Sequence, residues 1–170
     1  PDPVFSQKMV GDGLSIDPVD HALCAPLNGT VTQLHSALHA VTLTHSSGLE
    51  VMMHIGLDTV TLKSKGFEAH VQEGQQVKAG DPLITFDMDY IATHAKSLMT
   101  QIILTNGELV ESIEKSEGEV VVNESILMRV TLKEGFACES ETASGETIVS
   151  EAVIIPNTTG LHARPAALLA

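Results

Sequence analysis

The sequence predicts an all-β protein, an antiparallel sandwich or barrel with short helices. Three observations lead to this fold class. Ten of the 13 glycines divide residues 4 to 133 into short runs. Many of these runs are rich in β-branched residues, and aromatic residues make up only 3% of a chain that is 43% hydrophobic. Short strands separated by turn residues are typical of sandwiches and barrels, and this core must be built from aliphatic side chains.

The strands come first in the chain, and one helix interrupts them. The clearest strand candidates are residues 29–32, 40–44, 49–53, 82–86 and 126–132, whose β-branched content favours an extended backbone. A short surface helix is expected over residues 89–98, because Ile91, Ala95 and Leu98 share one helical face and Asp89 can serve as the N-cap.

The pattern changes after residue 133. Residues 139–147 are small, polar and acidic, so residues 135–151 are predicted to be a flexible linker. A strand at 152–155, a turn at 156–160 and a helix start at 162–169 follow. Because such short pieces cannot bury a core alone, residues 152–170 are expected to be the truncated α+β start of a second domain, after a main domain at 1–134.

Charge and composition exclude several classes of function. The formal net charge is −13 and the lysines and arginines are scattered, which argues against binding nucleic acid or anionic lipid. No run approaches the roughly 18 apolar residues of a membrane span, and the first residues do not resemble a signal peptide, so a cytoplasmic protein without membrane insertion is expected. Cys24 and Cys138 are far apart in sequence and are assigned no role.

Two of the eight histidines are related by a predicted hairpin. If residues 39–45 and 48–54 form strands around a two-residue turn at Ser46-Ser47, His39 lies opposite His54. Directly opposed Cβ atoms are roughly 5 Å apart, so both rings could touch one phosphoryl group or one metal ion. A register slip of one residue would turn one ring to the other face. The hairpin alone leaves open that both are ordinary strand residues.

The short sequence motifs around these two histidines indicate the function more specifically. They include residues 1–6 (PDPVFS), 11–13 (GDG), 25–31 (APLNGTV), 39–40 (HA), 54–60 (HIGLDTV), 65–67 (KGF), 73–81 (EGQQVKAGD) and 95–97 (AKS). In order and spacing they resemble the glucose-type IIA family of the bacterial phosphotransferase system, over residues 1–134, with the family's N-terminal strand expected before Pro1.

This resemblance implies a fold and a set of roles. The fold is the family's β-sandwich, His54 is the phosphorylated nucleophile, His39 stabilises the phosphoryl group and Asp58 supports the site. The family often has a threonine where this chain has Ala37. A hydroxyl that would bond the second imidazole is therefore missing, and Ser36 or the backbone is expected to orient His39 instead.

A second resemblance covers residues 152–170. Residues 155–157 (IPN) and 160–167 (GLHARPAA) resemble the active-site loop of HPr, the general phosphocarrier. It implies that His162 is the phosphohistidine of that domain in the intact protein and that Arg164 clamps the phosphate. A histidine at a helix entry faces unsatisfied N–H groups, and Pro165 suits the first helical turn.

The two resemblances imply a phosphocarrier of the phosphoenolpyruvate-dependent sugar phosphotransferase system. Phospho-HPr would phosphorylate His54, which would pass the group to the cysteine of a IIB domain of a sugar permease; HPr and enzyme I are expected on the same polypeptide. No cofactor, nucleotide or metal is needed. His21, His35, His45, His70 and His94 are assigned no chemistry.

Two alternatives belong to other classes. A zinc-dependent β-domain hydrolase would use His39 and His54 as zinc ligands, and the same pair could bind adventitious zinc, but no third ligand accompanies it. Residues 73–81 also resemble a biotinyl or lipoyl carrier domain, although the lysine attachment motif of such domains is not found.

Overall fold

A computed structural model of the chain describes residues 12–116, 126–133, 152–156 and 164–168. Its seven-stranded sheet has the order β13 (Arg164–Leu168), β1 (Asp12–Asp17), β9 (Thr100–Leu104), β5 (Glu50–His54), β4 (Ala40–Thr44), β3 (Gly29–Leu34) and β7 (Gln76–Val77). Two three-stranded sheets have the orders β2 (Ala22–Cys24), β8 (Pro82–Phe86), β6 (Phe67–Ala69) and β10 (Val110–Lys115), β11 (Ile126–Leu132), β12 (Ala152–Pro156).

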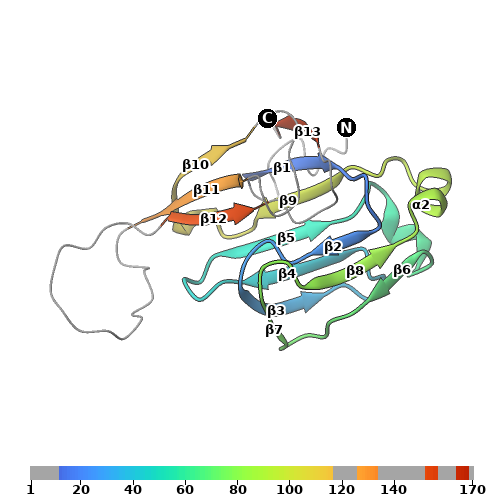
Figure 1. The fold of residues 1–170 in the computed structure, drawn as a ribbon, viewed down its shortest axis with the longest axis horizontal. Helices are drawn as coiled ribbons and strands as arrows, with labels where there is room; N and C mark the ends of the chain where they lie inside the picture. Colours follow the sequence, from blue (N-terminus) through green and yellow to red (C-terminus); the bar gives the residue numbers. More distant parts are fainter. Residues whose placement is uncertain (1–11, 117–125, 134–151, 157–163, 169–170) are drawn as a thin grey trace, which may run out of the picture.

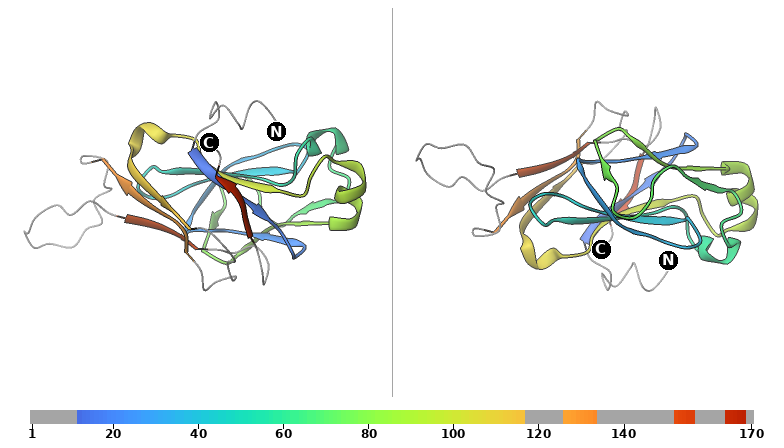
Figure 2. Two further views of the ribbon diagram at one scale, coloured as in Figure 1. Left: turned by 90° about the horizontal axis from the view of Figure 1, so that it is seen from above. Right: turned by 90° about the horizontal axis from the view of Figure 1, so that it is seen from below.

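All the strand pairings of these sheets are antiparallel, which confirms the predicted fold class. Within the described residues, short helices connect the strands: η1 (Thr59–Leu62), α2 (Met88–His94) and η2 (Gly107–Leu109). Figure 1 shows α2 at the end of the molecule opposite β10 to β12, and Figure 2 shows the layered arrangement from above and below.

The core lies on one face of the seven-stranded sheet. One row of this face runs across four strands through Val41, Met53, Ile102 and Leu14, which are consecutive cross-strand partners and are all buried. The strands β2 and β8 contribute Leu23, Ile84 and Phe86 to the same cluster. Burying an aliphatic side chain of this size stabilises the fold by about 1.5–3 kcal/mol. As expected from the composition, aliphatic residues dominate the core.

The observed strands agree closely with the predicted ones. The predictions at 40–44, 82–86 and 126–132 match β4, β8 and β11, the run at 29–32 lies inside β3, and β5 begins one residue later than expected. The helix differs more. It begins at Met88 and ends at His94, and its N-cap is Asp87, whose Oδ1 accepts from the Tyr90 amide at 3.0 Å. Asp87 has an extended backbone directly after β8, as an N-cap requires, and Asp89 lies inside the first turn.

The C-terminal prediction is wrong in one respect. Residues 164–168 form the strand β13, antiparallel to β1, instead of the start of a helix. The outer edge of β1 offers a row of backbone hydrogen-bonding groups, whereas an isolated helix of this length is marginal in water. Pro165 is compatible with an edge strand. The predicted strand at 152–155 is confirmed as β12, and the linker, the turn and His162 lie outside the described residues.

In the part of the chain that the structure describes, no helix is long and apolar enough to cross a membrane.

Candidate active site

The hairpin between β4 and β5 has a three-residue loop. The His45 amide donates to Leu49 O at 2.8 Å, and the Gly48 amide donates to His45 O at 2.9 Å. Gly48 has φ of 84°, the left-handed conformation that closes such a loop. The predicted loop had two residues. The extra one shifts the register, so His54 pairs with Ala40 and not with His39.

The two imidazoles nevertheless lie side by side. Their ring centroids are 4.7 Å apart and the ring planes are 84° from parallel. The expectation that a one-residue slip would separate them is wrong because His39 precedes the first residue of β4. It follows Leu38, which has φ of 57°, so the direction of its side chain does not obey the alternation of a regular strand.

The ring of His54 has a defined tautomer. Its Nδ1 lies 2.8 Å from the carbonyl oxygen of Gly56. A carbonyl oxygen only accepts, so Nδ1 carries the proton, and in the neutral ring the lone pair is on Nε2. Gly56 has φ of 69°, and a Cβ there would lie 2.7 Å from Ser97 O. Glycine at this position therefore lets the chain turn sharply enough to return a carbonyl to the histidine two residues before it.

His39 is the buried member of the pair. It is 3% exposed, and its Nδ1 has no hydrogen-bond partner within the described ranges. Burial first, and then the neighbouring His54 and His35, lowers the pKa of His39 from 6.5 to about 4. Its ring is thus neutral near neutral pH and carries one N–H. Neither Ser36 nor the backbone donates a hydrogen bond to Nδ1 of His39, so the expected replacement for the family's threonine is not seen at this atom within the described residues.

A third imidazole was missed by the sequence analysis. The ring of His35 lies 4.6 Å from that of His39, centroid to centroid, with 64° between the planes. The tight turn that begins at His35 brings them together, since the Leu38 amide donates to His35 O and the His35 amide donates to Ala40 O. The sequence signal for this contact was a turn between two strands with a histidine at each end.

Asp58 lies four residues after His54, where the chain enters η1. Its carboxylate forms an ion pair with Lys96, and both side chains are well exposed. The backbone reinforces this junction, because the Leu57 amide donates to Ser97 O and the Lys96 amide donates to Leu57 O. The segment after α2 and the turn after β5 are thereby joined next to the histidines.

The remaining candidates are placed as follows. Arg164 lies in β13, with Asp17 of β1 as its register partner. Three of the other histidines have local partners: His45 with Ser47, His70 with Thr85, and His94 stacked on Tyr90. Among the described residues, no group of three or more histidine, cysteine or acidic side chains could hold a metal ion.

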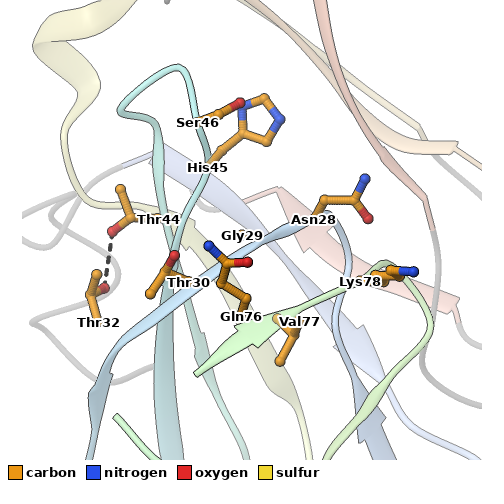
Figure 3. Close-up of a pocket in the computed structure, with 10 residues that line it drawn as sticks. All are labelled: Asn28, Gly29, Thr30, Thr32, Thr44, His45, Ser46, Gln76, Val77 and Lys78. Carbon is orange, nitrogen blue, oxygen red and sulfur yellow. Dashed lines mark hydrogen bonds between the residues drawn. The ribbon is translucent and has the colours of Figure 1, made fainter. Parts of the chain in front are cut away.

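A groove of about 740 Å³ lies at the other end of β3 and β4 from His39. Figure 3 shows the side chains that line it. Hydroxyl and amide side chains line much of it, and Thr44 donates to Thr32 across it at 3.0 Å. Lys78 and His45 also belong to its lining. The groove is separate from the imidazole pair.

Comparisons with known proteins agree with one another. The family described as "phosphoenolpyruvate-dependent sugar phosphotransferase system, EIIA 1" matches residues 1–110. The chain is 45% identical to proteins called "PTS system glucose-specific EIIA component" from Bacillus cereus and Bacillus anthracis, over 134 residues, 78% of this chain and 81% of each relative. The solved structure of glucose permease IIA from Mycoplasma capricolum superposes with a TM-score of 0.62 at 38% identity, covering 67% of this chain and 75% of that one.

Proposed function

Because the chain belongs to the EIIA 1 family of the phosphoenolpyruvate-dependent sugar phosphotransferase system and is a phosphocarrier, we propose that His54 carries its phosphoryl group. The observation that supports this assignment is the bond from Nδ1–H of His54 to the Gly56 carbonyl, at 2.8 Å. It leaves the lone pair of the neutral ring on Nε2, beside a second imidazole. A nucleophile at one ring nitrogen and a donor next to it are what transfer between histidines requires.

The transfer step conserves atoms and electrons without a nucleotide or water. The Nε2 lone pair attacks the phosphorus of a phosphohistidine on the donor, a P–N bond to His54 forms, and the donor's P–N bond breaks with its electron pair returning to the donor's imidazole. The ring of His54 becomes more positive as the bond forms, and the Gly56 carbonyl stabilises this charge through Nδ1–H. Onward transfer reverses the process when a thiolate attacks the same phosphorus.

His39 stabilises the phosphoryl group in this proposal. A pKa of about 4 keeps its ring neutral, so it presents one N–H to a phosphoryl oxygen without adding a positive charge that would hold the group too tightly. Asp58 has a supporting role, because its ion pair with Lys96 ties the turn after β5 to the segment after α2.

The partners follow from the family. An EIIA component exchanges phosphoryl groups with HPr and with a IIB domain, and we place this chain in the cytoplasm with them. The heptad at 160–166 supports an HPr domain that begins near residue 152, with His162 and Arg164 at its site and enzyme I on the same polypeptide. In that arrangement residues 135–151 are a linker between the two domains.

Two variants test the assignment. With phospho-HPr as donor, His54→Gln should accept no acid-labile phosphate, whereas His39→Gln should still be labelled, because glutamine retains an N–H donor. Transfer from labelled His39→Gln to a IIB domain should be slowed, since glutamine lacks the geometry of the imidazole. His45→Gln, changed at the far end of the hairpin, is the matched control and should behave like wild type. Label retained in His54→Gln, or lost equally in both variants, would contradict these roles.

A further inference from the structure

A row of side chains crosses the large sheet through His54. In β4 the cross-strand partner of His54 is Ala40, and in β9 it is Gln101. The partner of Gln101 on its other side is Ser15, in β1. Directly paired residues of neighbouring strands project from the same face of a sheet, with Cβ atoms roughly 4.5–5.5 Å apart. Gln101 is therefore the neighbour of His54 on the adjacent strand β9, and Ser15 is the neighbour of Gln101 on β1.

Gln101 is held in place by two hydrogen bonds. The Ser15 hydroxyl donates to Gln101 Oε1 at 2.6 Å, and Gln101 Nε2 donates to Met99 O at 3.2 Å. Ser15 and Gln101 are 1% and 2% exposed, so solvent does not compete for these bonds. The amide thus has one orientation, which the hydroxyl and the carbonyl determine together.

Fold stability alone does not explain a buried polar pair at this position. An amide and a hydroxyl lose solvation on burial, and their mutual bond only offsets that loss, so an apolar pair of similar shape would be about as stable. In β9 the three residues after Gln101 are buried and apolar, and Thr100 before it is buried and polar. The Gln101–Ser15 pair is the buried polar pair in the row that contains His54.

We propose that Gln101, whose amide is held by Ser15, is a positioning residue for His54. The ordered amide limits the movement of the imidazole and keeps it in the rotamer that donates Nδ1–H to Gly56. In this rotamer Nε2 faces the incoming phosphoryl group. This inference rests on the proposed role of His54. The ring is then held on three sides, by the Gly56 carbonyl, by the ring of His39 and by Gln101.

The burial of Gln101 predicts which kinetic quantity changes when this residue is substituted. A residue that is 2% exposed does not contact a docked protein, so removing its amide should leave the half-saturating concentration of phospho-HPr unchanged. The maximal rate constant of transfer should fall, because the ring populates its reactive orientation less of the time.

The experiment compares wild type, Gln101→Leu and the double variant Ser15→Ala/Gln101→Leu, with phospho-HPr as donor and rapid-quench detection of acid-labile phosphate. The double variant leaves no buried polar atom of the pair without its partner, so it should fold as well as wild type. In both variants we expect the maximal rate constant to fall about 5- to 20-fold, with half-saturation within twofold of wild type. The ¹⁵N shifts of the His54 ring should report a larger Nε2–H fraction.

Ile103→Val is the matched control, since Ile103 is buried on the same strand and the same sheet face as Gln101. It should lower the melting temperature and leave both the rate constant and the His54 tautomer unchanged. The inference is overturned if the folded double variant transfers phosphate at the wild-type rate, or if Ile103→Val slows transfer equally. Failure of the proposed function looks different, because His54→Gln would then be labelled whatever stands at residue 101.

Discussion

The buried ring of His39 should make the stability of the protein depend on pH in a calculable way. In the folded chain burial lowers its pKa to about 4, while in the unfolded chain the ring titrates near its ordinary value of 6.5. Between these two values the unfolded state binds more protons, so acid favours unfolding. The contribution is fully present above pH 6.5 and is lost as the pH falls toward 4.

The magnitude follows from the two pKa values. Between about pH 7.5 and about pH 5, the free energy of unfolding should fall by about 2 kcal/mol on account of this one ring. Urea unfolding of wild type and His39→Gln at a series of pH values isolates the effect, because the carboxylates titrate in both proteins and cancel in the difference. The gap between the two curves should change by about that amount over this range.

A matched control is His94→Gln, which removes an exposed imidazole stacked on Tyr90. Its curve should run parallel to that of wild type. If the wild-type and His39→Gln curves run parallel instead, His39 is not buried neutral and the argument for a neutral donor beside His54 fails.

Three further perturbations test other parts of the site. Gly56→Ala places a Cβ 2.7 Å from Ser97 O at a left-handed φ, so denaturant unfolding should show a loss of about 2–3 kcal/mol and labelling should slow; an unchanged midpoint would contradict the strain. Asp58→Asn breaks only an exposed ion pair, so the free energy of unfolding measured with denaturant should fall by less than about 1 kcal/mol. A larger loss would mean that the ion pair organises the site. Ala37→Thr restores a hydroxyl near His39 and should speed transfer to IIB; slower transfer would show that the hydroxyl is misplaced.

The strands were predictable because their signal is local. Runs such as residues 40–44 combine β-branched residues with flanking turn residues, and the structure has the strand where the run lies. The register was not predictable in the same way. The register depends on whether the loop has two residues or three. A three-residue loop needs Gly48 in a left-handed conformation, which the sequence Ser-Ser-Gly permits but does not require.

The candidate site was predicted only in part, because some of its contacts are local in sequence and others are not. The pairing of His39 with His54 was expected from hairpin arithmetic and from the resemblance, and the rings do meet, although the arithmetic was off by one residue. His35 meets His39 through a local turn, which the resemblance and the hairpin did not point to. Gln101 could not be found by these means, because it lies in a strand nearly 50 residues away and neighbours His54 only in the assembled sheet.

The C-terminal segment shows the limit of a local signal. The heptad around His162 indicates a helix start, but a helical preference of a few residues is worth less than pairing with an open sheet edge. Residues 164–168 accordingly lie along β1.

The position of β5 in the sheet has a consequence for partial unfolding. This strand has neighbours on both sides, β4 and β9, and its Val51 and Met53 are fully buried. Backbone amides in such a strand exchange with solvent only when the whole domain opens, whereas short outer strands such as β7 open in local fluctuations. Hydrogen exchange should therefore be slowest at the backbone that carries His54. Under the proposed assignment of the phosphoryl group to His54, the residue that carries it keeps its backbone geometry while the outer strands of the sheet open and close.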